Sequence, residues 1–175
     1  MTHRIITVRE ARVDDALAIA TAHVRAWQTA YRSIMPDPFL DALRIEDRVA
    51  RWRSILAGPL AVPGNWNGVV ALDDRVVGFC TAGDSRDDPA MSELWGINVD
   101  PDAFGTGAGQ ALLDATHTEL DKRSQPVAML WVVRENARAR RFYERNGWSA
   151  DGATKTQDFG GQPVTELRYT RSKRG

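Results

Sequence analysis

The sequence lacks the features that mark secreted, membrane-spanning and nucleic-acid-binding chains. Its single cysteine, Cys80, cannot form an internal disulfide, so we expect a reducing cytoplasm. No apolar run approaches about 18 residues, the length needed to span a bilayer, and we therefore expect no membrane partner. Lys and Arg together number 23, as do Asp and Glu, which gives a net charge of +0. The basic excess typical of nucleic-acid binders is missing, so no nucleic-acid partner is expected.

The length fits one domain. The chain has 175 residues and shows no internal repeat, low-complexity run or linker rich in Pro, Gly and Ser. We therefore expect a single domain over residues 1–175 with a hydrophobic core of its own.

Hydrophobic spacing predicts seven strands and four helices. The predicted strands are Ile5–Arg9, Val69–Leu72, Val76–Thr81, Glu93–Val99, Val127–Val133, Ser149–Phe159 and Val164–Tyr169. The predicted helices begin at Val13, Ile45, Gly107 and Asn136. This order indicates a mixed α+β sheet with helices on its faces rather than a regular alternation of strand and helix.

Proline, glycine and turn-forming residues set the expected ends of these elements. The first helix carries an apolar stripe at 13, 17, 20, 24, 27 and 31 and is broken at Met35-Pro36-Asp37-Pro38. The second helix should stop at Gly58-Pro59, and the last at a left-handed Gly147. Asp73-Asp74 fits a hairpin turn between two strands.

A glycine-rich turn follows the predicted strand Glu93–Val99 and opens a helix. It reads Phe104-Gly105-Thr106-Gly107-Ala108-Gly109-Gln110. Glycines let backbone N–H groups gather around an anion at a positive helix N-terminus, and a pyrophosphate suits such a turn. A flexible connection is the alternative. A dinucleotide fingerprint needs G-x-G-x-x-G and a P-loop needs Gly-Lys-Ser/Thr, and the turn has neither pattern.

A second group of residues lies about thirty positions further on. Asn136, Ala139 and Tyr143 fall at i, i+3 and i+7 of the predicted helix and so share one face. Phe142 precedes Tyr143, and Gly147-Trp148 follows. On spacing alone, the favoured interpretation of Tyr143 is a half-buried packing residue.

Together the two patterns resemble the GNAT superfamily of N-acetyltransferases. The family's phosphate-binding pattern, Q/R-x-x-G-x-G/A, aligns with Phe104 through Gly109, and its second signature aligns with Asn136 through Trp148. One departure is that Phe104 stands where the family usually has Gln or Arg. The resemblance extends over nearly the whole chain and implies a mostly antiparallel sheet of about seven strands with one splayed parallel pair.

The resemblance implies acetyl-CoA as cosubstrate and no metal. Backbone groups of Ile97 and Val99 would pair with the pantetheine arm, and the Val99 N–H would stabilise an oxyanion. Asn136 would bind the arm beside Tyr143. The residues that would hold the pyrophosphate are Gly105, Thr106, Gly107, Ala108, Gly109 and Gln110.

Transfer to an amine poses two proton problems. The acceptor is an ammonium at neutral pH and must lose a proton, while the departing thiolate must gain one. The resemblance assigns the acid to Tyr143. Glu93, which begins the strand lining the implied cleft, is our choice of base, acting directly or through a water, with an exposed strand-end charge as the alternative.

Other reactive side chains have simpler interpretations. His23 and His117 lie on predicted helices and His3 near the N-terminus, and Cys80 sits in an apolar strand as a small core residue. Arg138, Arg141 and Arg145 share a helix face, which is either solvated or close to a phosphate of CoA.

The expected activity is N-acetylation of a primary amine in a small molecule or peptide. A non-catalytic acyl-CoA sensor and a protein-interaction module of the same fold are the alternatives. Trp27 and Tyr31 end the first helical stripe near the implied acceptor side, where aromatic rings suit an apolar group or an amine cation. Core packing competes with that role, above all for Trp27. Because homodimers are common among members of the family, the resemblance also implies a possible homodimer.

Overall fold

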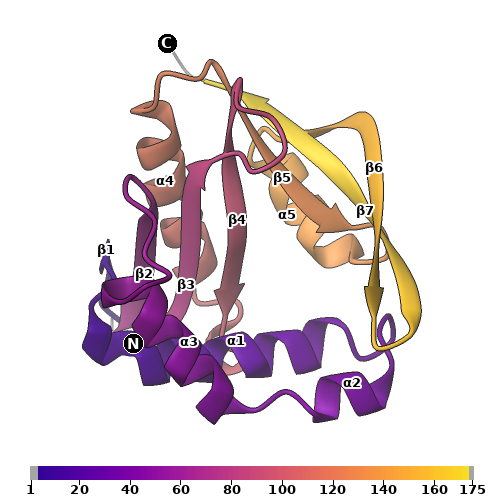
Figure 1. The fold of residues 1–175 in the computed structure, drawn as a ribbon. Helices are drawn as coiled ribbons and strands as arrows, with labels where there is room; N and C mark the ends of the chain where they lie inside the picture. The colour runs from indigo at the N-terminus through magenta and orange to yellow at the C-terminus, as the bar shows by residue number, and fades with distance from the viewer. Residues whose placement is uncertain (1–3, 174–175) are drawn as a thin grey trace.

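The computed structural model describes residues 4–173. The predicted order of strands and helices is confirmed, with a short extra helix after the first one (Figure 1). The strands are β1 (Ile6–Glu10), β2 (Trp66–Leu72), β3 (Arg75–Asp84), β4 (Met91–Val99), β5 (Val127–Val133), β6 (Ser149–Phe159) and β7 (Gln162–Ser172). The α-helices are α1 (Ala16–Ala30), α2 (Asp37–Asp41), α3 (Ile45–Ala57), α4 (Ala108–Asp121) and α5 (Ala137–Arg145).

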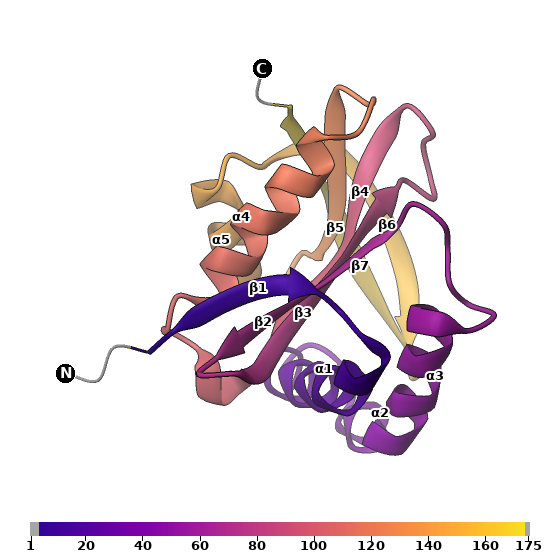
Figure 2. The same ribbon diagram turned by 90° about the vertical axis from the view of Figure 1, so that its left-hand side faces the viewer.

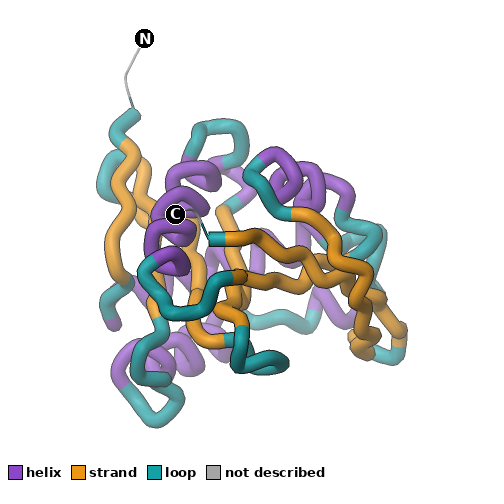
Figure 3. Tube along the Cα trace, turned by 90° about the horizontal axis from the view of Figure 1, so that it is seen from above, coloured by secondary structure: helices purple, strands orange, loops and turns teal. Residues whose placement is uncertain are grey.

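All seven strands form one sheet in the order β1-β2-β3-β4-β5-β7-β6. Every neighbouring pair is antiparallel except β4 and β5, which are parallel. Helices α4 and α5 lie on one face and α1 and α3 on the other (Figures 2 and 3). The expected mixed sheet with helices on both faces is confirmed.

Two apolar cores stabilise the two faces of the sheet. The larger one packs α4 residues such as Leu112 and Leu113 against β3, β4 and β5. The smaller one joins Ile19 of α1 and Trp52 of α3 to Val69 and Phe79. Because each face is covered, the central strands β2, β3 and β5 are largely buried and read as apolar runs rather than as strict alternation.

Turn chemistry accounts for the ends of several elements. Asp73 and Asp74 have φ values of 49° and 66°, as a two-residue hairpin of the I′ type requires. Gly147 has a φ of 84° just after α5 and provides the left-handed end that was expected. Helix α3 ends at Gly58, also as expected.

The predicted core stripe of the first helix is wrong at its N-terminal end. Val13 lies in a 3-10 turn, and Val13 and Leu17 are 40% and 61% exposed. Small residues do the packing instead: Ala16, Ala20 and Ala22 are each at most 1% exposed. Because these side chains are short, α1 can lie close to the sheet and to α3, and the larger Leu17 turns to solvent.

A third cluster joins the segment around α2 to the β6–β7 hairpin. Met35 and Leu40 pack with Val133 and Val164. Trp27 and Tyr31 pack on the edge of this cluster, which holds the end of α1 beside the end of β5. No helix within residues 4–173 combines the length and apolarity needed to cross a bilayer.

Candidate active site

Strands β4 and β5 pair over only three residues and then separate. Met91 to Glu93 pair with Val127 to Met129, and beyond them the strands diverge (Figure 1). On its other side, β4 carries a bulge: Thr81 pairs with Gly96 and Ala82 with Leu94, which leaves Trp95 without a partner. A bulge bends a strand, so β4 turns away from β5. Its edge beyond Glu93 is open to an added extended chain.

This divergence lies in an open cleft of about 1450 Å³. The cleft extends from the end of α1, across β4, to the start of α5 and to β7. Most of the residues expected from the sequence line it: Trp27, Tyr31, Ile97, Val99, Gly105, Gly107, Gly109, Gln110, Asn136 and Tyr143. Thr106, Ala108 and Glu93 are not among the lining residues.

The glycine-rich turn is shaped by its backbone. Gly105 and Gly107 have φ values of 76° and 92°, which only glycine adopts without strain. A side chain at Gly105 would meet no atom within 4 Å, so the space beside the turn is open. The Thr106 hydroxyl donates to the Ala103 carbonyl (2.7 Å) and accepts from the Ala108 amide (3.3 Å). The turn is thus held from within. The Ala108 amide is used in this way, and the next amides of the first turn of α4, those of Gly109 and Gln110, remain for an anion.

Tyr143 lies on α5 and is 8% exposed. Burial raises its pKa well above the ordinary value, with smaller contributions from Tyr31 and Cys80. The phenol is therefore protonated at neutral pH and able to donate a proton. Asn136 is the N-cap of α5, not an interior residue, and its Oδ1 accepts from the Ala139 amide (3.1 Å).

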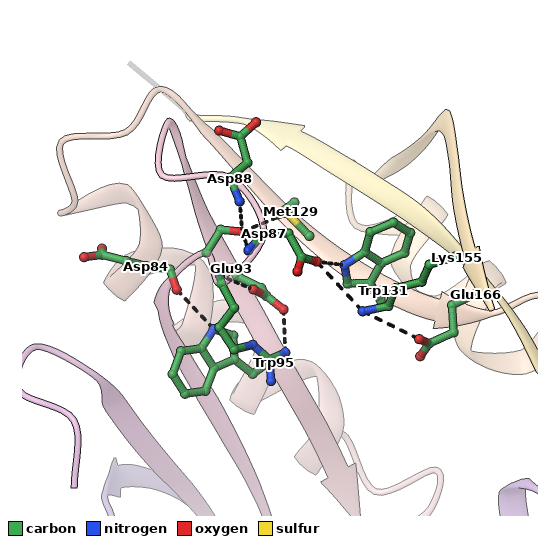
Figure 4. A network of polar contacts seen from close by, with 11 residues as sticks. Asp84, Asp87, Asp88, Glu93, Trp95, Met129, Trp131, Lys155 and Glu166 are labelled. Carbon is green, nitrogen blue, oxygen red and sulfur yellow. Dashed lines mark hydrogen bonds and ion pairs between the residues drawn. The ribbon is translucent and has the colours of Figure 1, made fainter. Parts of the chain in front are cut away.

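Two carboxylates lie near the divergence in different surroundings (Figure 4). Glu93 is 1% exposed and accepts from the Arg86 amide (3.0 Å) and the Arg86 guanidinium (2.7 Å). It is a buried ion-pair partner and not an exposed strand-end charge. Glu166 of β7 lines the cleft, and its Oε2 lies 3.7 Å from the Lys155 ammonium.

Burial raises the pKa of Glu166, and the nearby Lys155 partly opposes the shift. The buried Oε2 of Glu166 accepts no hydrogen bond from any residue in the described part of the chain. Lys155 also lies 3.8 Å from Asp87, which in turn accepts from the Trp131 indole N–H (2.7 Å). This network holds Lys155 beside Glu166 (Figure 4).

Comparison with known proteins identifies the family. The model of the Acetyltransferase (GNAT) family matches residues 24–148, well over half of the chain. The chain belongs to the GNAT family. An uncharacterized N-acetyltransferase of Bacillus subtilis, YuaI, is 31% identical over 137 residues, which are 75% of this chain and 74% of YuaI.

Solved structures share the GNAT fold over almost the whole chain. The PaiA N-acetyltransferase of Thermoplasma acidophilum, in complex with coenzyme A, superimposes with a TM-score of 0.75 at 16% identity, covering 96% of this chain and 99% of that one. The structure of Salmonella typhimurium yncA with its cofactor acetyl-CoA superimposes with a TM-score of 0.72 at 19% identity, covering 98% of this chain and 95% of that one. These similarities establish the fold.

The one departure from the GNAT phosphate-binding pattern has a structural counterpart. Phe104, in the position of the usual Gln or Arg, carries the guanidinium of Arg138 3.5 Å above its ring. Arg138 and Arg145 line the cleft and Arg141 does not, so the three arginines do not act as one face. The Gln110 side chain donates to Asn146 (2.7 Å) and Asp114 (2.8 Å) and ties α4 to α5.

The remaining cysteine and histidines are mostly packing residues, as expected. Burial raises the pKa of the Cys80 thiol to about 12, and the thiol accepts from the Thr116 hydroxyl (3.2 Å). His117 accepts from the Trp148 indole N–H (2.9 Å). His3 lies outside the described residues. Within residues 4–173 no cluster of three or more His, Cys, Asp or Glu side chains is placed to hold a metal.

His23 differs from the other histidines because it lines the cleft. Its ring packs against Trp27, Trp52 and Phe79. Burial, together with the smaller effect of the charges of Arg48 and Arg51, lowers the pKa of His23 to about 4. His23 is therefore neutral at pH 7.

Sequence analysis missed two parts of the cleft wall. The sequence contained a weak indication that Glu166 faces the cleft. It lies two residues after the buried Val164 on β7, and every second residue of a strand points to the same face of the sheet. The sequence contained no indication that Arg48 and Arg51 of α3 line the cleft. Polar residues between the apolar positions of a helix are normally solvated.

Proposed function

We propose that this protein transfers the acetyl group of acetyl-CoA to a primary amine of a small molecule or peptide by direct attack. The amine nitrogen forms a bond to the carbonyl carbon, the carbon–sulfur bond breaks, and protons leave the amine and reach the sulfur. The observation that supports this most is the convergence of three features in one cleft: the glycine-rich turn, the open edge of β4 and the protonated Tyr143.

The backbone is suited to hold the cosubstrate. We assign the pyrophosphate to the turn of Gly105, Thr106, Gly107, Ala108, Gly109 and Gln110, chiefly through main-chain amides, because the Thr106 and Gln110 side chains are already bonded within the protein. The open edge of β4 at Ile97 and Val99 is suited to pair with the pantetheine arm, with Asn136 beside it. Arg138, stacked on Phe104, adds a positive charge to this end of the cleft.

Tyr143 is the proposed acid. Its raised pKa keeps the proton on the phenol at neutral pH, and its place in the cleft wall beside Asn136 is suited to protonate a thiolate. Cys80, buried and with a raised pKa, is a poor nucleophile, which favours direct attack over an acetyl-cysteine route.

Two carboxylates compete for the role of base. Glu93, the choice from the sequence, is enclosed by Arg86 and would act through a water or after Arg86 moves. Glu166 lines the cleft, has a raised pKa and keeps a buried oxygen free of hydrogen bonds from the described residues. A carboxylate with a pKa closer to the operating pH is the better base, so we favour Glu166.

Trp27 and Tyr31 form part of the proposed acceptor wall. Their rings stack edge-on at 5.1 Å between centroids, and both line the cleft while also packing on the third cluster. They therefore combine the binding role and the packing role that the sequence left open. The cytoplasmic location and the homodimer remain predictions.

The test is thiol release from acetyl-CoA over a panel of primary amines. Release that depends on the acceptor establishes the activity. Tight binding of acetyl-CoA with no release for any amine or peptide would instead favour the non-catalytic sensor.

A further inference from the structure

One wall of the cleft carries two arginines that form no ion pair with the described residues. Arg48 and Arg51 lie one turn apart on α3, and both line the cleft beside His23. Neither forms an ion pair or a side-chain hydrogen bond with any residue in 4–173. Elsewhere, arginines within 4 Å of a carboxylate are common: Arg9, Arg25, Arg32, Arg86, Arg123, Arg168 and Arg171.

This arrangement is unfavourable in the protein alone. Like charges at i and i+3 of a helix repel each other. Arg48 is half-buried and Arg51 is exposed. Burial lowers the pKa of Arg48, the charge of Arg51 lowers it further, and Asp47 partly opposes the shift. The Nδ1 of His23 is buried and has no hydrogen-bond partner among the described residues. An anion between these groups would remove the repulsion and satisfy the free donors.

The arginine pair is separate from the proposed phosphate site. Helix α3 packs against α1 in the smaller core, on one face of the sheet. The glycine-rich turn opens α4, which packs in the larger core on the opposite face (Figure 2). The two positive regions therefore line different ends of one cleft, with Tyr143 and Glu166 also in its wall.

We infer that Arg48 and Arg51 bind an anionic group of the acceptor, so that the acceptor is an amine carrying a carboxylate or a phosphate-type group. The inference rests on the proposed function. Guanidinium forks match both kinds of oxyanion in bidentate fashion. The acceptor amine then points toward Glu166 and Tyr143, and its linking atoms lie along the aromatic wall that includes Trp27.

The first test compares acids with their neutral counterparts in the thiol-release assay. One pair is 4-aminobutanoate and 4-aminobutanamide, and the other is 2-aminoethylphosphonate and ethanolamine. The first pair tests recognition of a carboxylate, and the second tests recognition of a phosphate-type group. Charged hydrogen bonds support roughly a 10- to 100-fold preference in kcat/KM for the preferred acid. The double variant Arg48→Gln, Arg51→Gln should bring that ratio close to one.

Arg53→Gln is the matched control, because Arg53 is an exposed arginine of the same helix that does not line the cleft. It should keep the wild-type ratio. Turnover of amines with an acid-to-neutral ratio near one in both pairs, or a ratio that survives in the double variant, would refute the anion site and leave the acetyltransferase intact.

The second test needs no turnover. The histidine ring signals of protein saturated with CoA are followed by NMR during titration with inorganic phosphate and, separately, acetate. Because CoA already fills the phosphate turn, a saturable shift of His23 with at least one anion reports binding at α3. The shift should vanish in the double variant and persist in Arg53→Gln.

The two proposals can fail independently. A saturable His23 shift without any amine-dependent thiol release would support the anion site and contradict the acetyltransferase. The absence of a saturable shift with both anions, or an equal shift in the double variant, would overturn the anion site whatever the kinetics show.

Discussion

At the scale of single residues, the environment of each side chain decides which chemistry it can perform. Tyr143 and Cys80 are both buried and both have raised pKa values, yet the consequences differ. A phenol that keeps its proton remains a useful acid, whereas a thiol that keeps its proton is a poor nucleophile. Burial thus leaves Tyr143 able to donate a proton and makes Cys80 a poor nucleophile.

Glu166→Gln should lower kcat by roughly 100-fold or more, as loss of a general base does. The base must be deprotonated, so activity falls as pH drops through its pKa. Because the pKa of Glu166 is raised by burial, the acid limb of the kcat/KM profile should lie above the ordinary carboxylate value of 4.5. A pH series of thiol release measures both quantities.

Glu93→Gln is the matched comparison for the base. It should change the rate less than Glu166→Gln does, provided the Tm shows that the variant folds. The opposite ranking would restore the base expected from the sequence.

Arg138→Gln should raise the KM for acetyl-CoA several-fold. A fully formed charged hydrogen bond to a phosphate is worth about 1.5–3 kcal/mol, and solvent screens part of that at the exposed Arg138. Arg141→Gln removes the same charge from the same helix at a position outside the cleft and should leave that KM unchanged. Steady-state kinetics at saturating amine distinguishes the two. Equal effects would mean that only the net charge of α5 matters.

At the scale of elements, the glycine-rich turn depends on left-handed backbone as well as on open space. Acetyl-CoA at about 100 times its Kd should stabilise the protein by roughly 2.7 kcal/mol, a Tm rise on the order of 5–10 °C. Gly107→Val should abolish most of that shift, because a valine is strained where φ is 92° and its Cβ would press on Ile6 Cδ1 at 3.4 Å, which distorts the turn.

Gly161→Val controls for backbone strain in that experiment. Gly161 has a φ of 88° with no atom within 4 Å of an added side chain, and it lies in the β6–β7 hairpin. This variant should lose stability yet keep the full acetyl-CoA shift. A full shift in folded Gly107→Val would remove the pyrophosphate from the turn.

The sequence predicted the helices and strands better than it predicted the cleft. Spacing and turn residues predicted all seven strands, the four longer helices and the hairpin at Asp73-Asp74. They did not show that Leu17 faces solvent, because a helical stripe does not tell which side a neighbouring helix covers. Glu166 and Arg48 were missed for a related reason: periodicity gives a face, whereas a cleft is formed by distant segments that meet only in the fold.

At the scale of the whole molecule, one buried histidine should affect stability in acid. The pKa of His23 is about 4 in the folded state and about 6.5 when exposed, so the unfolded chain binds its proton more readily between these values. Folding stability should therefore fall as pH drops from about 6.5 to about 4, by at most about 3 kcal/mol.

His23→Phe should flatten this part of the pH dependence, since an aromatic ring is retained among Trp27, Trp52 and Phe79 without a titrating group. Urea unfolding of both proteins from pH 4 to pH 7 gives the difference. Identical slopes for the two would show that His23 is free to protonate in the folded state.

The central claim is that this cleft transfers acetyl groups with Tyr143 as the acid, and one paired measurement tests it most directly. Amine-dependent thiol release and acetyl-CoA affinity are measured for the wild type and Tyr143→Phe. We predict a loss in kcat of roughly 100-fold or more, with Kd for acetyl-CoA nearly unchanged because the ring and its packing remain. Wild-type turnover in Tyr143→Phe across the pH range would contradict the account.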